Sequence, residues 1–332
     1  MIDRPLVGVL GLARSGRAAA ELALSAGARV FGSDGGDSAA VWEAAEAIRR
    51  AGGEAEVGRH SVERLAECDV LVVSPGIPPT APVLVDPRLA GVPQVSELEF
   101  AFQHLRSPVI AVTGTNGKTT TAWLLRHLLG ARYPAASLGT LGVVGADGAL
   151  RTGEDALTTP GPVELARTLA GLVSEGVEAV AMEVSSHALD QGRVEALRFD
   201  AAVFTNLSRD HLDYHGTEEA YLAAKRSLVA LMRPEGTAVV NAEDPAWEGL
   251  AESAPRALRF GVSGTEAEVR AESVEVGSFG ARFRLVGPGG EAPVSIPLLG
   301  AFNVQNALGA AGACLALGFT VEEVAARLES VP

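Results

Sequence analysis

The sequence contains little cysteine, few aromatic residues and no long hydrophobic run. Its two cysteines, Cys68 and Cys314, lie far apart among 332 residues, so a disulfide framework is not expected and a reducing cytoplasm is the simplest location. No stretch of about eighteen apolar residues occurs, and therefore no membrane-spanning helix is predicted. The chain opens on a strand-like segment (LVGVL) instead of a signal peptide.

Basic residues are in deficit, because 27 lysines and arginines face 41 acidic residues and the formal net charge is −14. This charge argues against non-specific binding to nucleic acid or to an anionic membrane. It does not exclude a nucleotide ligand, since backbone N–H groups and a few cations can bind phosphate inside an acidic protein.

Short β-branched runs alternate with alanine-rich stretches along most of the chain, which is typical of parallel β-α-β units. Strands are predicted at residues 6–10, 29–31, 70–73, 109–113, 179–183, 201–205 and 237–241. Helices are predicted at residues 15–26, 38–51, 303–317 and 321–329. Residues 261–296 show period-two runs broken by glycines, and they predict a small antiparallel excursion attached to the second sheet.

The segment AVTGTNGKTT, residues 111–120, is the strongest motif. A hydrophobic strand leads into a glycine turn, and a lysine, a threonine and a predicted helix follow, which is the context of a phosphate-binding loop. Lys118 would add a cation near the β- and γ-phosphates, and the Thr119 hydroxyl could bind Mg²⁺. The alternative is a glycine-rich turn with an exposed lysine. ATP contacts are therefore predicted at Gly114, Thr115, Asn116, Gly117, Lys118, Thr119 and Thr120.

The loop departs from the usual pattern at Val112, where a further glycine would stand five residues before Gly117. The shortened form resembles the Mur ligases, the ATP-dependent enzymes that add amino acids to UDP-N-acetylmuramoyl peptides in peptidoglycan synthesis, and the related folylpolyglutamate synthetases. We therefore expect an α/β protein with a Rossmann-like parallel-sheet domain at residues 1–106. A P-loop ATPase-type domain is expected at residues 107–332, and the resemblance leads us to expect that the third, amino-acid-binding domain of these ligases is missing.

Three further residues are predicted to serve the phosphate loop. Glu183 ends a strand, so it would face the loop across the carboxyl edge of a parallel sheet. The resemblance implies that Glu183 and His211 bind two Mg²⁺ ions, and that Lys225 of the Y-x-x-A-K pattern is carbamylated and supports a metal. The alternatives are a capping carboxylate for Glu183, a loop histidine for His211 and a solvated lysine for Lys225.

Other segments resemble the Mur ligase that acts third, which adds diaminopimelate or lysine. Thr158, Thr159, Ser185 and Arg193 are similar to its substrate contacts, and arginine can hold a carboxylate with two parallel hydrogen bonds. A surface salt bridge is the alternative for Arg193. In GAFNVQNALGA, the resemblance implies that Asn303 and Asn306 contact the adenine side of ATP, whereas the motif alone would suggest helix caps.

The first glycine loop, at residues 11–16, has the spacing of a dinucleotide-binding fingerprint. Ala13 stands where such enzymes need a glycine close to the pyrophosphate, which weakens the interpretation as an NAD oxidoreductase. The loop, SPGIP at 74–78 and VSELEF at 95–100 resemble the D-glutamate-adding Mur ligase, whose first domain holds UDP. UDP-substrate contacts are predicted at Gly11, Leu12, Ala13, Arg14, Ser15, Gly16, Asp34, Ser74, Pro75 and Gly76.

The resemblance implies that ATP phosphorylates the carboxylate at the end of the UDP-sugar peptide and that an amino acid then attacks the acyl phosphate. Either D-glutamate or diaminopimelate/lysine could be added, and a divergent enzyme, a chimera or a reconstructed ancestor would each show this mixture. We expect a cytoplasmic monomer that binds the UDP substrate but has little or no activity as a two-domain piece. A folylpolyglutamate-synthetase-like ligase and a nucleotide-sugar-binding module without full activity remain alternatives.

Overall fold

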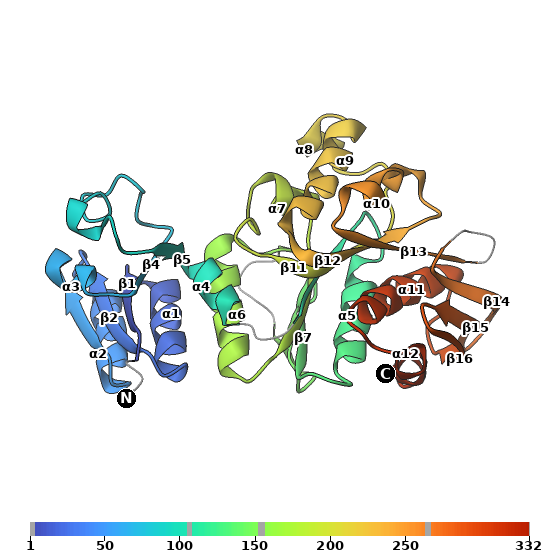
Figure 1. Ribbon diagram of the computed structural model, residues 1–332, viewed down its shortest axis with the longest axis horizontal. Helices are drawn as coiled ribbons and strands as arrows, with labels where there is room; N and C mark the ends of the chain where they lie inside the picture. The colour runs from blue at the N-terminus through green and yellow to red at the C-terminus, as the bar shows by residue number, and fades with distance from the viewer. Residues whose placement is uncertain (1–3, 105–107, 152–156, 263–266, 332) are drawn as a thin grey trace. The chain divides into compact units, whose positions relative to one another are not determined.

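The computed structural model describes residues 4–104, 108–151, 157–262 and 267–331, and Figure 1 shows its elements. The chain divides into two compact units. The first unit comprises residues 1–105 and 161–176, and the second comprises residues 106–160 and 177–332. The sequence gives no indication that the helix α6 (Pro162–Ser174) returns to the first unit, where it packs against α1 and α4. None of the described helices is long and apolar enough to cross a bilayer.

The first unit is built on a parallel sheet. Within the described residues its strand order is β3-β2-β1-β4-β5, the order of a Rossmann-like half. The strands are β1 (Leu6–Leu10), β2 (Arg29–Asp34), β3 (Glu54–Val57), β4 (Val70–Val73) and β5 (Gln94–Ser96). The helices are α1 (Arg14–Ser25), α2 (Ala39–Arg50), α3 (Val62–Ala66) and α4 (Glu97–Gln103), with a 3-10 turn η1 (Pro87–Leu89). Every residue of β1 is buried, as expected of a parallel strand covered on both faces.

The second unit has a larger mixed sheet with the order β16-β15-β14-β13-β12-β11-β6-β10-β7-β8-β9 among its described residues. Its parallel centre consists of β6 (Val109–Thr113), β7 (Ala135–Gly139), β10 (Ala179–Glu183), β11 (Phe199–Phe204), β12 (Met232–Asn241) and β13 (Arg256–Val262). Antiparallel pairing extends one edge through β8 (Gly142–Val144) and β9 (Leu150–Arg151). At the other edge β14 (Val269–Gly277) pairs parallel with β13, and β15 (Gly280–Gly287) and β16 (Gly290–Ile296) continue the sheet by antiparallel pairing.

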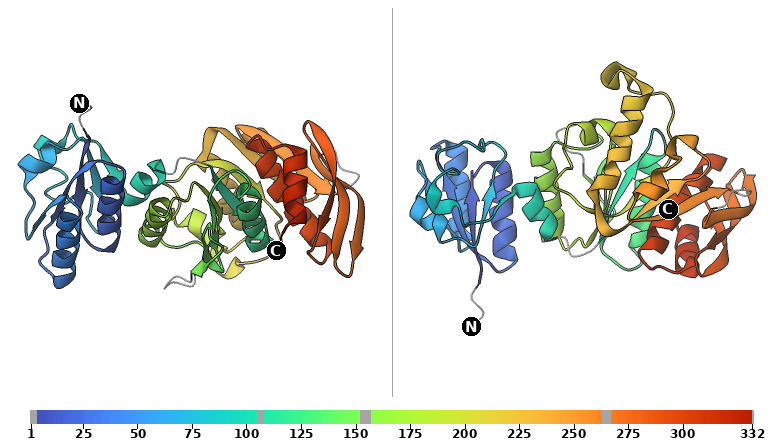
Figure 2. Two further views of the ribbon diagram at one scale, coloured as in Figure 1. Left: turned by 90° about the horizontal axis from the view of Figure 1, so that it is seen from below. Right: turned by 45° about the horizontal axis from the view of Figure 1, so that its top comes forward.

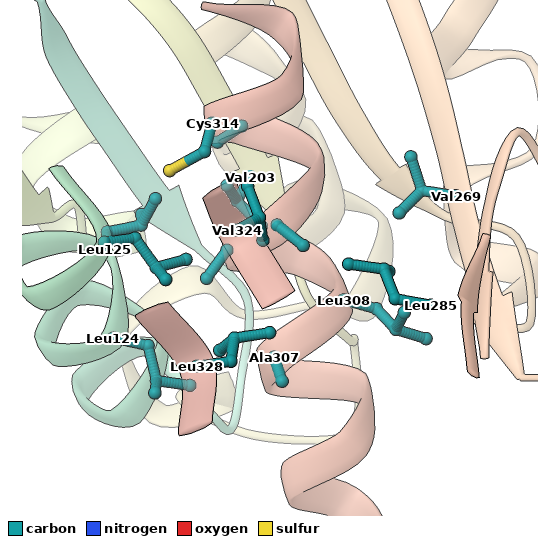
Figure 3. Packing of buried hydrophobic residues seen from close by; sticks show 14 of the residues in the cluster. Leu124, Leu125, Val203, Val269, Leu285, Ala307, Leu308, Cys314, Val324 and Leu328 are labelled. Atoms are coloured by element: carbon teal, nitrogen blue, oxygen red, sulfur yellow. The ribbon is translucent and has the colours of Figure 1, made fainter. Parts of the chain in front are cut away.

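Helices α5 (Lys118–Leu129), α11 (Ala301–Ala316) and α12 (Val321–Glu329) cover one face of this sheet. Figure 3 shows leucines of α5 and α12 meeting α11 and strand residues such as Val203 in one hydrophobic core. The antiparallel strands β14–β16 form a layer beside α11 and α12 (Figure 2). Alanine and glycine make up most of the buried side of α11, so the helix can approach the sheet closely.

The remaining elements are short and connect the parallel strands of the second sheet. They are α7 (Ser186–Asp190), α8 (Leu212–His215), α9 (Glu218–Arg226), η2 (Ser227–Leu231), η3 (Pro245–Trp247) and α10 (Leu250–Ser253). Strand β6 lies between β10 and β11, and all three run parallel. Residues that follow these strands therefore meet at one edge.

The predicted fold class is confirmed, including the antiparallel excursion, which forms β14–β16. Strands β1, β4, β6 and β10 and helix α12 have the predicted bounds, and other predicted bounds are corrected. Strand β2 extends three residues beyond its predicted end, and β12 begins five residues before its predicted start. Strand β11 covers residues 199–204 instead of 201–205, and helix α11 begins at residue 301 instead of 303.

Candidate active site

The phosphate loop connects β6 to α5, and its conformation requires glycine at two positions. Gly117 precedes α5 with φ +83°, a left-handed conformation, and a Cβ there would collide with the Asn306 amide. Gly114 has φ +146°, and a Cβ there would collide with the Thr205 hydroxyl. The loop is therefore packed from two sides, by α11 and by the end of β11.

Hydrogen bonds from the segment after β11 fix the loop. The Thr115 N–H donates to the Asn206 carbonyl at 2.7 Å, and the Asn116 N–H donates to the Asn206 side-chain oxygen at 3.0 Å. The Thr205 hydroxyl donates to the Asn116 carbonyl at 2.7 Å. Sequence reasoning missed Thr205 and Asn206, although their position directly after a buried strand beside β6 was a usable signal.

Lys118 lies half-buried at the start of α5 and folds back over the loop. Its Nζ donates to the carbonyl oxygens of Gly114 at 3.0 Å and of Thr115 at 2.9 Å. Burial lowers the pKa of Lys118, while Glu183 and Asp210 act in the opposite direction. The exposed-lysine alternative is therefore wrong for Lys118, whose positively charged Nζ lies directly against the phosphate loop.

Lys225 is almost completely buried, with 1% of its surface exposed, at the end of α9. Its Nζ donates to the Gly114 carbonyl at 2.7 Å and lies 4.7 Å from the centre of the Tyr221 ring. Burial, and secondly the charge of Lys118, lower the pKa of Lys225 to about 7. The solvated-lysine alternative is wrong, because this amine is enclosed and half of it is neutral near neutral pH.

The two lysine nitrogens thus share one acceptor, the Gly114 carbonyl oxygen. The whole sequence contains two lysines, Lys118 and Lys225, and its other 25 basic residues are arginines. Two ammonium groups within about 6 Å of each other repel strongly where little water screens them. The residue composition itself marks these two positions as unusual, because a chain that otherwise uses arginine has lysine at 118 and 225.

Glu183 ends β10 and is buried at 1% exposure. Its carboxylate accepts from the Thr140 N–H at 2.8 Å and from the Thr140 hydroxyl at 3.2 Å. These contacts orient the carboxylate from the end of β7. Thr140 is a site residue that sequence reasoning missed, and nothing in its local sequence marks it.

His211 belongs to a cluster of aromatic and imidazole rings above the sheet edge. It adopts φ +51°, unusual for a residue with a side chain, and its imidazole lies 3.5 Å from the Asp210 carboxylate. The ring centres of His187 and His211 are 4.8 Å apart, and those of His187 and His215 are 5.5 Å apart. Among the described residues, no three His, Cys, Asp or Glu side chains come together closely enough to hold a metal alone.

Asn303 and Asn306 are both buried on the first turns of α11. Asn306 donates to the Asn303 side-chain oxygen at 3.0 Å, and its own oxygen accepts from Thr121 at 3.5 Å. Asn303 donates to the Leu299 carbonyl at 2.8 Å. The helix-cap alternative is wrong, because the N-cap position of α11 is Gly300 and both asparagines lie inside the helix.

The predicted acceptor residues form one connected network. The Thr159 hydroxyl donates to the Glu183 carbonyl at 2.9 Å and accepts from the Ser185 N–H at 3.0 Å. Arg193 donates to the Thr159 carbonyl at 2.9 Å and to the Gln191 side-chain oxygen. The Thr158 hydroxyl lies 3.0 Å from that of Thr140. Arg193 has no carboxylate partner in the described part of the chain, so the salt-bridge alternative is wrong.

In the first unit, the glycine loop joins β1 to α1. Gly11 has φ +87°, and a Cβ on Gly16 would collide with the Gly11 carbonyl, so both positions require glycine. Asp34 accepts from the Leu12 N–H at 2.7 Å and from the Gly36 N–H at 2.8 Å, which ties the loop to the end of β2. Ser15 and Ser74 are buried, whereas Ala13, Pro75 and Gly76 are exposed, and the side chain of Arg14 lies outside the described part.

Glu97, within the VSELEF segment, is buried beside the glycine loop with 2% of its surface exposed. Burial raises the pKa of its carboxyl group. The VSELEF segment was identified from the sequence, but Glu97 was not predicted as a site residue.

Comparison with known proteins agrees with this geometry. A family described as "Mur ligase middle domain" matches residues 112–314. The UDP-N-acetylmuramoyl-L-alanyl-D-glutamate–2,6-diaminopimelate ligase of Geobacillus kaustophilus (strain HTA426) is 45% identical over 234 residues, which are 68% of this chain and 47% of that protein. The UDP-N-acetylmuramyl-tripeptide synthetase of Deinococcus radiodurans is 41% identical over 225 residues, 67% of this chain and 45% of that one.

A solved structure of a UDP-N-acetylmuramoyl-L-alanyl-D-glutamate–2,6-diaminopimelate ligase has a TM-score of 0.60 and 25% identity, covering 91% of this chain and 60% of that one. The chain spans about half the length of the curated relatives it matches.

Proposed function

Because the chain belongs to the Mur ligase family, we propose that it is an ATP-dependent ligase that joins a free amino acid to a UDP-N-acetylmuramoyl peptide through an acyl phosphate. The observation that carries this proposal is the meeting of the two lysines at the Gly114 carbonyl of a preformed phosphate loop. An oxidoreductase that binds NAD through the first glycine loop would not require two lysines at the phosphate loop of the second unit.

ATP would bind with its phosphates on the loop of residues 114–120. Lys118 would leave its carbonyl partners for the β- and γ-phosphates and neutralise charge that develops during phosphoryl transfer. Asn303 and Asn306 would contact the adenine side of ATP. The hydrogen bond between them supports a fixed orientation of both side-chain amides.

Thr119 and Glu183 offer the oxygen ligands that Mg²⁺ prefers, with His211 and a modified Lys225 as further candidates. Among the residues that the structure describes, the protein groups do not form a complete cage. This fits Mg²⁺, which usually keeps several waters and binds substrate phosphates together with one or two carboxylates. Bound there, Mg²⁺ would neutralise phosphate charge. A negative group at Lys225 would help to support a second ion.

Lys225 would supply that group as a carbamate. The ammonium first loses one proton. The neutral amine then attacks CO₂, an N–C bond forms while one C=O bond of CO₂ opens to a carboxylate, and the nitrogen loses a second proton, so a cation becomes an anion. Three features support the modification: the amine is buried, its pKa is lowered to about 7, and Lys118 repels its charged form. The carbamate would turn the repulsion by Lys118 into attraction.

The UDP moiety would bind in the first unit at residues 11–16, Asp34 and residues 74–76, where the start of helix α1 offers N–H groups to a diphosphate. Because both Asp34 oxygens hold backbone N–H groups, Asp34 would act mainly by shaping the loop. The acceptor peptide would meet Thr158, Thr159, Ser185 and Arg193. The names of the relatives favour the third step, the addition of diaminopimelate to a D-glutamate-ending peptide.

The test is a pair of calorimetric titrations with UDP-N-acetylmuramoyl-L-alanine and with its D-glutamate-extended form, each followed by ATP and Mg²⁺. The proposal requires tighter binding of the extended form and phosphate release that depends on this acceptor and on diaminopimelate. Preference for the shorter peptide would favour D-glutamate addition. Binding of NADH, with no response to either peptide, would overturn the ligase assignment.

A further inference from the structure

A second concave pocket lies in the second unit at the C-terminal end of α5. It has a volume of about 460 Å³, and arginines from two helices line it together with His127, Tyr133 and small residues. No Asp or Glu is among the described residues that line it, although the protein as a whole carries a net charge of −14. Helix α5 has 12 residues, so its two ends are about 18 Å apart. The pocket is therefore separate from the phosphate loop.

Two helix ends are tied together at this pocket. Arg327, on the last turn of α12, donates through Nε to the His127 carbonyl at 2.9 Å. The His127 imidazole lies 2.9 Å from the Arg327 carbonyl and 3.1 Å from the Ser330 hydroxyl. These reciprocal contacts hold Arg327 beside Arg126 and fix the geometry of the basic wall.

The charges of Arg126 and Arg327 are not neutralised within the described part of the chain, where neither makes an ion pair. Arg126 donates through Nη1 to the Gly145 carbonyl at 3.3 Å, and its Nε is buried without any hydrogen-bond partner. Burial, and then the charge of Arg327, lower the pKa of Arg126, while Asp147 acts in the opposite direction. Asp147 itself faces Arg151 at 3.7 Å.

Arg132, which lines the same pocket, behaves differently. It pairs with Glu323 at 2.6 Å and stacks on the Phe319 ring at 4.1 Å. The fold thus neutralises one arginine of the pocket and leaves two side by side.

Helix capping explains only part of this arrangement. Arginine in the last turn of a helix is stabilised by the free carbonyls there, and one N–H of Arg327 has that role. Capping does not require two guanidinium groups to face each other, and it leaves the buried Arg126 Nε unsatisfied. An oxyanion between the two groups would accept from the guanidinium N–H groups that line the pocket and remove their repulsion, although the buried Arg126 Nε itself is not accessible to it.

We propose that this pocket binds a small phosphorylated anion, clamped by Arg126 and Arg327. The planar guanidinium fork matches phosphate oxygens, and the cavity is of the size that small ligands occupy. Gly130, Ala131, Ala135 and Ala146 leave room beside the phosphoryl group. This site is independent of the proposed ligase activity.

The experiment titrates pyrophosphate, with EDTA present, into the Lys118→Ala protein, whose phosphate loop no longer competes. Calorimetry should show one site that depends on Arg126 and Arg327, besides any pyrophosphate that binds at residues 11–16 of the first unit. Adding Arg126→Gln and Arg327→Gln should weaken binding at least tenfold, whereas Arg132→Gln should change it less than about twofold, because Arg132 is already paired. Repeating the titration with phenyl phosphate distinguishes an organic monoester from an inorganic anion as the better ligand.

A second readout keeps the test valid if the double glutamine variant folds poorly. Pyrophosphate should slow hydrogen exchange at residues 126–131 and 327–330 of the Lys118→Ala protein, and Arg126→Lys with Arg327→Lys should retain charge but lose most of this protection. Unchanged binding in the double variant, an equal loss in Arg132→Gln, or protection confined to residues 114–120 would each overturn the proposal.

Discussion

Replacing Lys225 by methionine should stabilise the protein and abolish catalysis. The ammonium of Lys225 is buried beside Lys118, so its charged form is disfavoured in the folded state, where the pKa is about 7. In the unfolded chain the pKa returns to about 10.4. The difference corresponds to roughly 4–5 kcal/mol of destabilisation when the lysine is fully charged, at about 1.36 kcal/mol for each tenfold change.

The methionine variant also loses the hydrogen bond to the Gly114 carbonyl, which for a charged donor contributes about 1.5–3 kcal/mol. The net gain at pH 6 is then roughly 1–3 kcal/mol. Its pH dependence has a definite sign. Between about pH 7 and 10.4 the unfolded wild type binds more protons than the folded one, so wild-type stability rises with pH in that window. The advantage of Lys225→Met should therefore be largest at or below pH 7 and should vanish, or reverse, by about pH 10.

The assay is urea denaturation at pH 6, 8 and 9.5 in CO₂-free buffer, with and without bicarbonate. Bicarbonate should stabilise the wild type and leave Lys225→Met unchanged, because only the lysine can form a carbamate. With ¹³C-bicarbonate, a carbamate resonance can come only from Lys118, Lys225 or the N-terminal amine, so Lys118→Met is the matched control and should retain it. A variant that is less stable than wild type at pH 6, together with no bicarbonate effect, would refute this reasoning.

Three further substitutions test other parts of the site. Lys118→Ala should reduce acceptor-dependent phosphate release at least about 100-fold, since it removes a charge stabiliser. The fold should remain intact, because the two lost hydrogen bonds to the loop are offset by the end of the repulsion with Lys225; retained activity would contradict its role. Gly16→Ala should destabilise the first unit by about 1–3 kcal/mol in denaturant titrations, because the new Cβ meets the Gly11 carbonyl, and should abolish UDP binding. Arg193→Lys should raise KM for the D-glutamate-ending acceptor about tenfold while KM for ATP stays constant, since lysine lacks the two-pronged fork; equal changes in both constants would argue against an acceptor role.

The sequence predicted best where a strand is buried on both faces. Strands β1, β6 and β10 are continuous hydrophobic runs, and their predicted bounds match the structure. Strands β3 (EAEV) and β5 (QVS) were missed because they are short and half-exposed, with no apolar run to mark them. The return of α6 to the first unit depends on its packing against α1 and α4, and no local pattern encodes such a tertiary contact.

In the candidate site, too, residues that belong to a local motif were predicted, whereas features that depend on tertiary packing were not. The motif was sufficient to select Gly114, Gly117 and Lys118, because each has a local conformational or chemical reason to be there. The local sequence around Lys225 could not predict that this side chain is buried. Helix α9 is amphipathic, and its polar residues suggest a solvent-exposed face. Burial arises from the packing of the helix end over the loop, across a sequence separation of 111 residues.

The two asparagines of α11 support the conformation of the phosphate loop. A buried amide is costly unless its donors and acceptors are satisfied. On a helix otherwise rich in alanine and glycine, Asn306 reaches Asn303 and Thr121 and lies against Gly117. Thr121 lies on α5 directly after the loop, so a shift of the loop together with the start of α5 would break its hydrogen bond to the Asn306 oxygen. A side chain at position 117 would collide with that oxygen and force such a shift. The Asn306 amide of α11 and the glycine at position 117 therefore depend on each other.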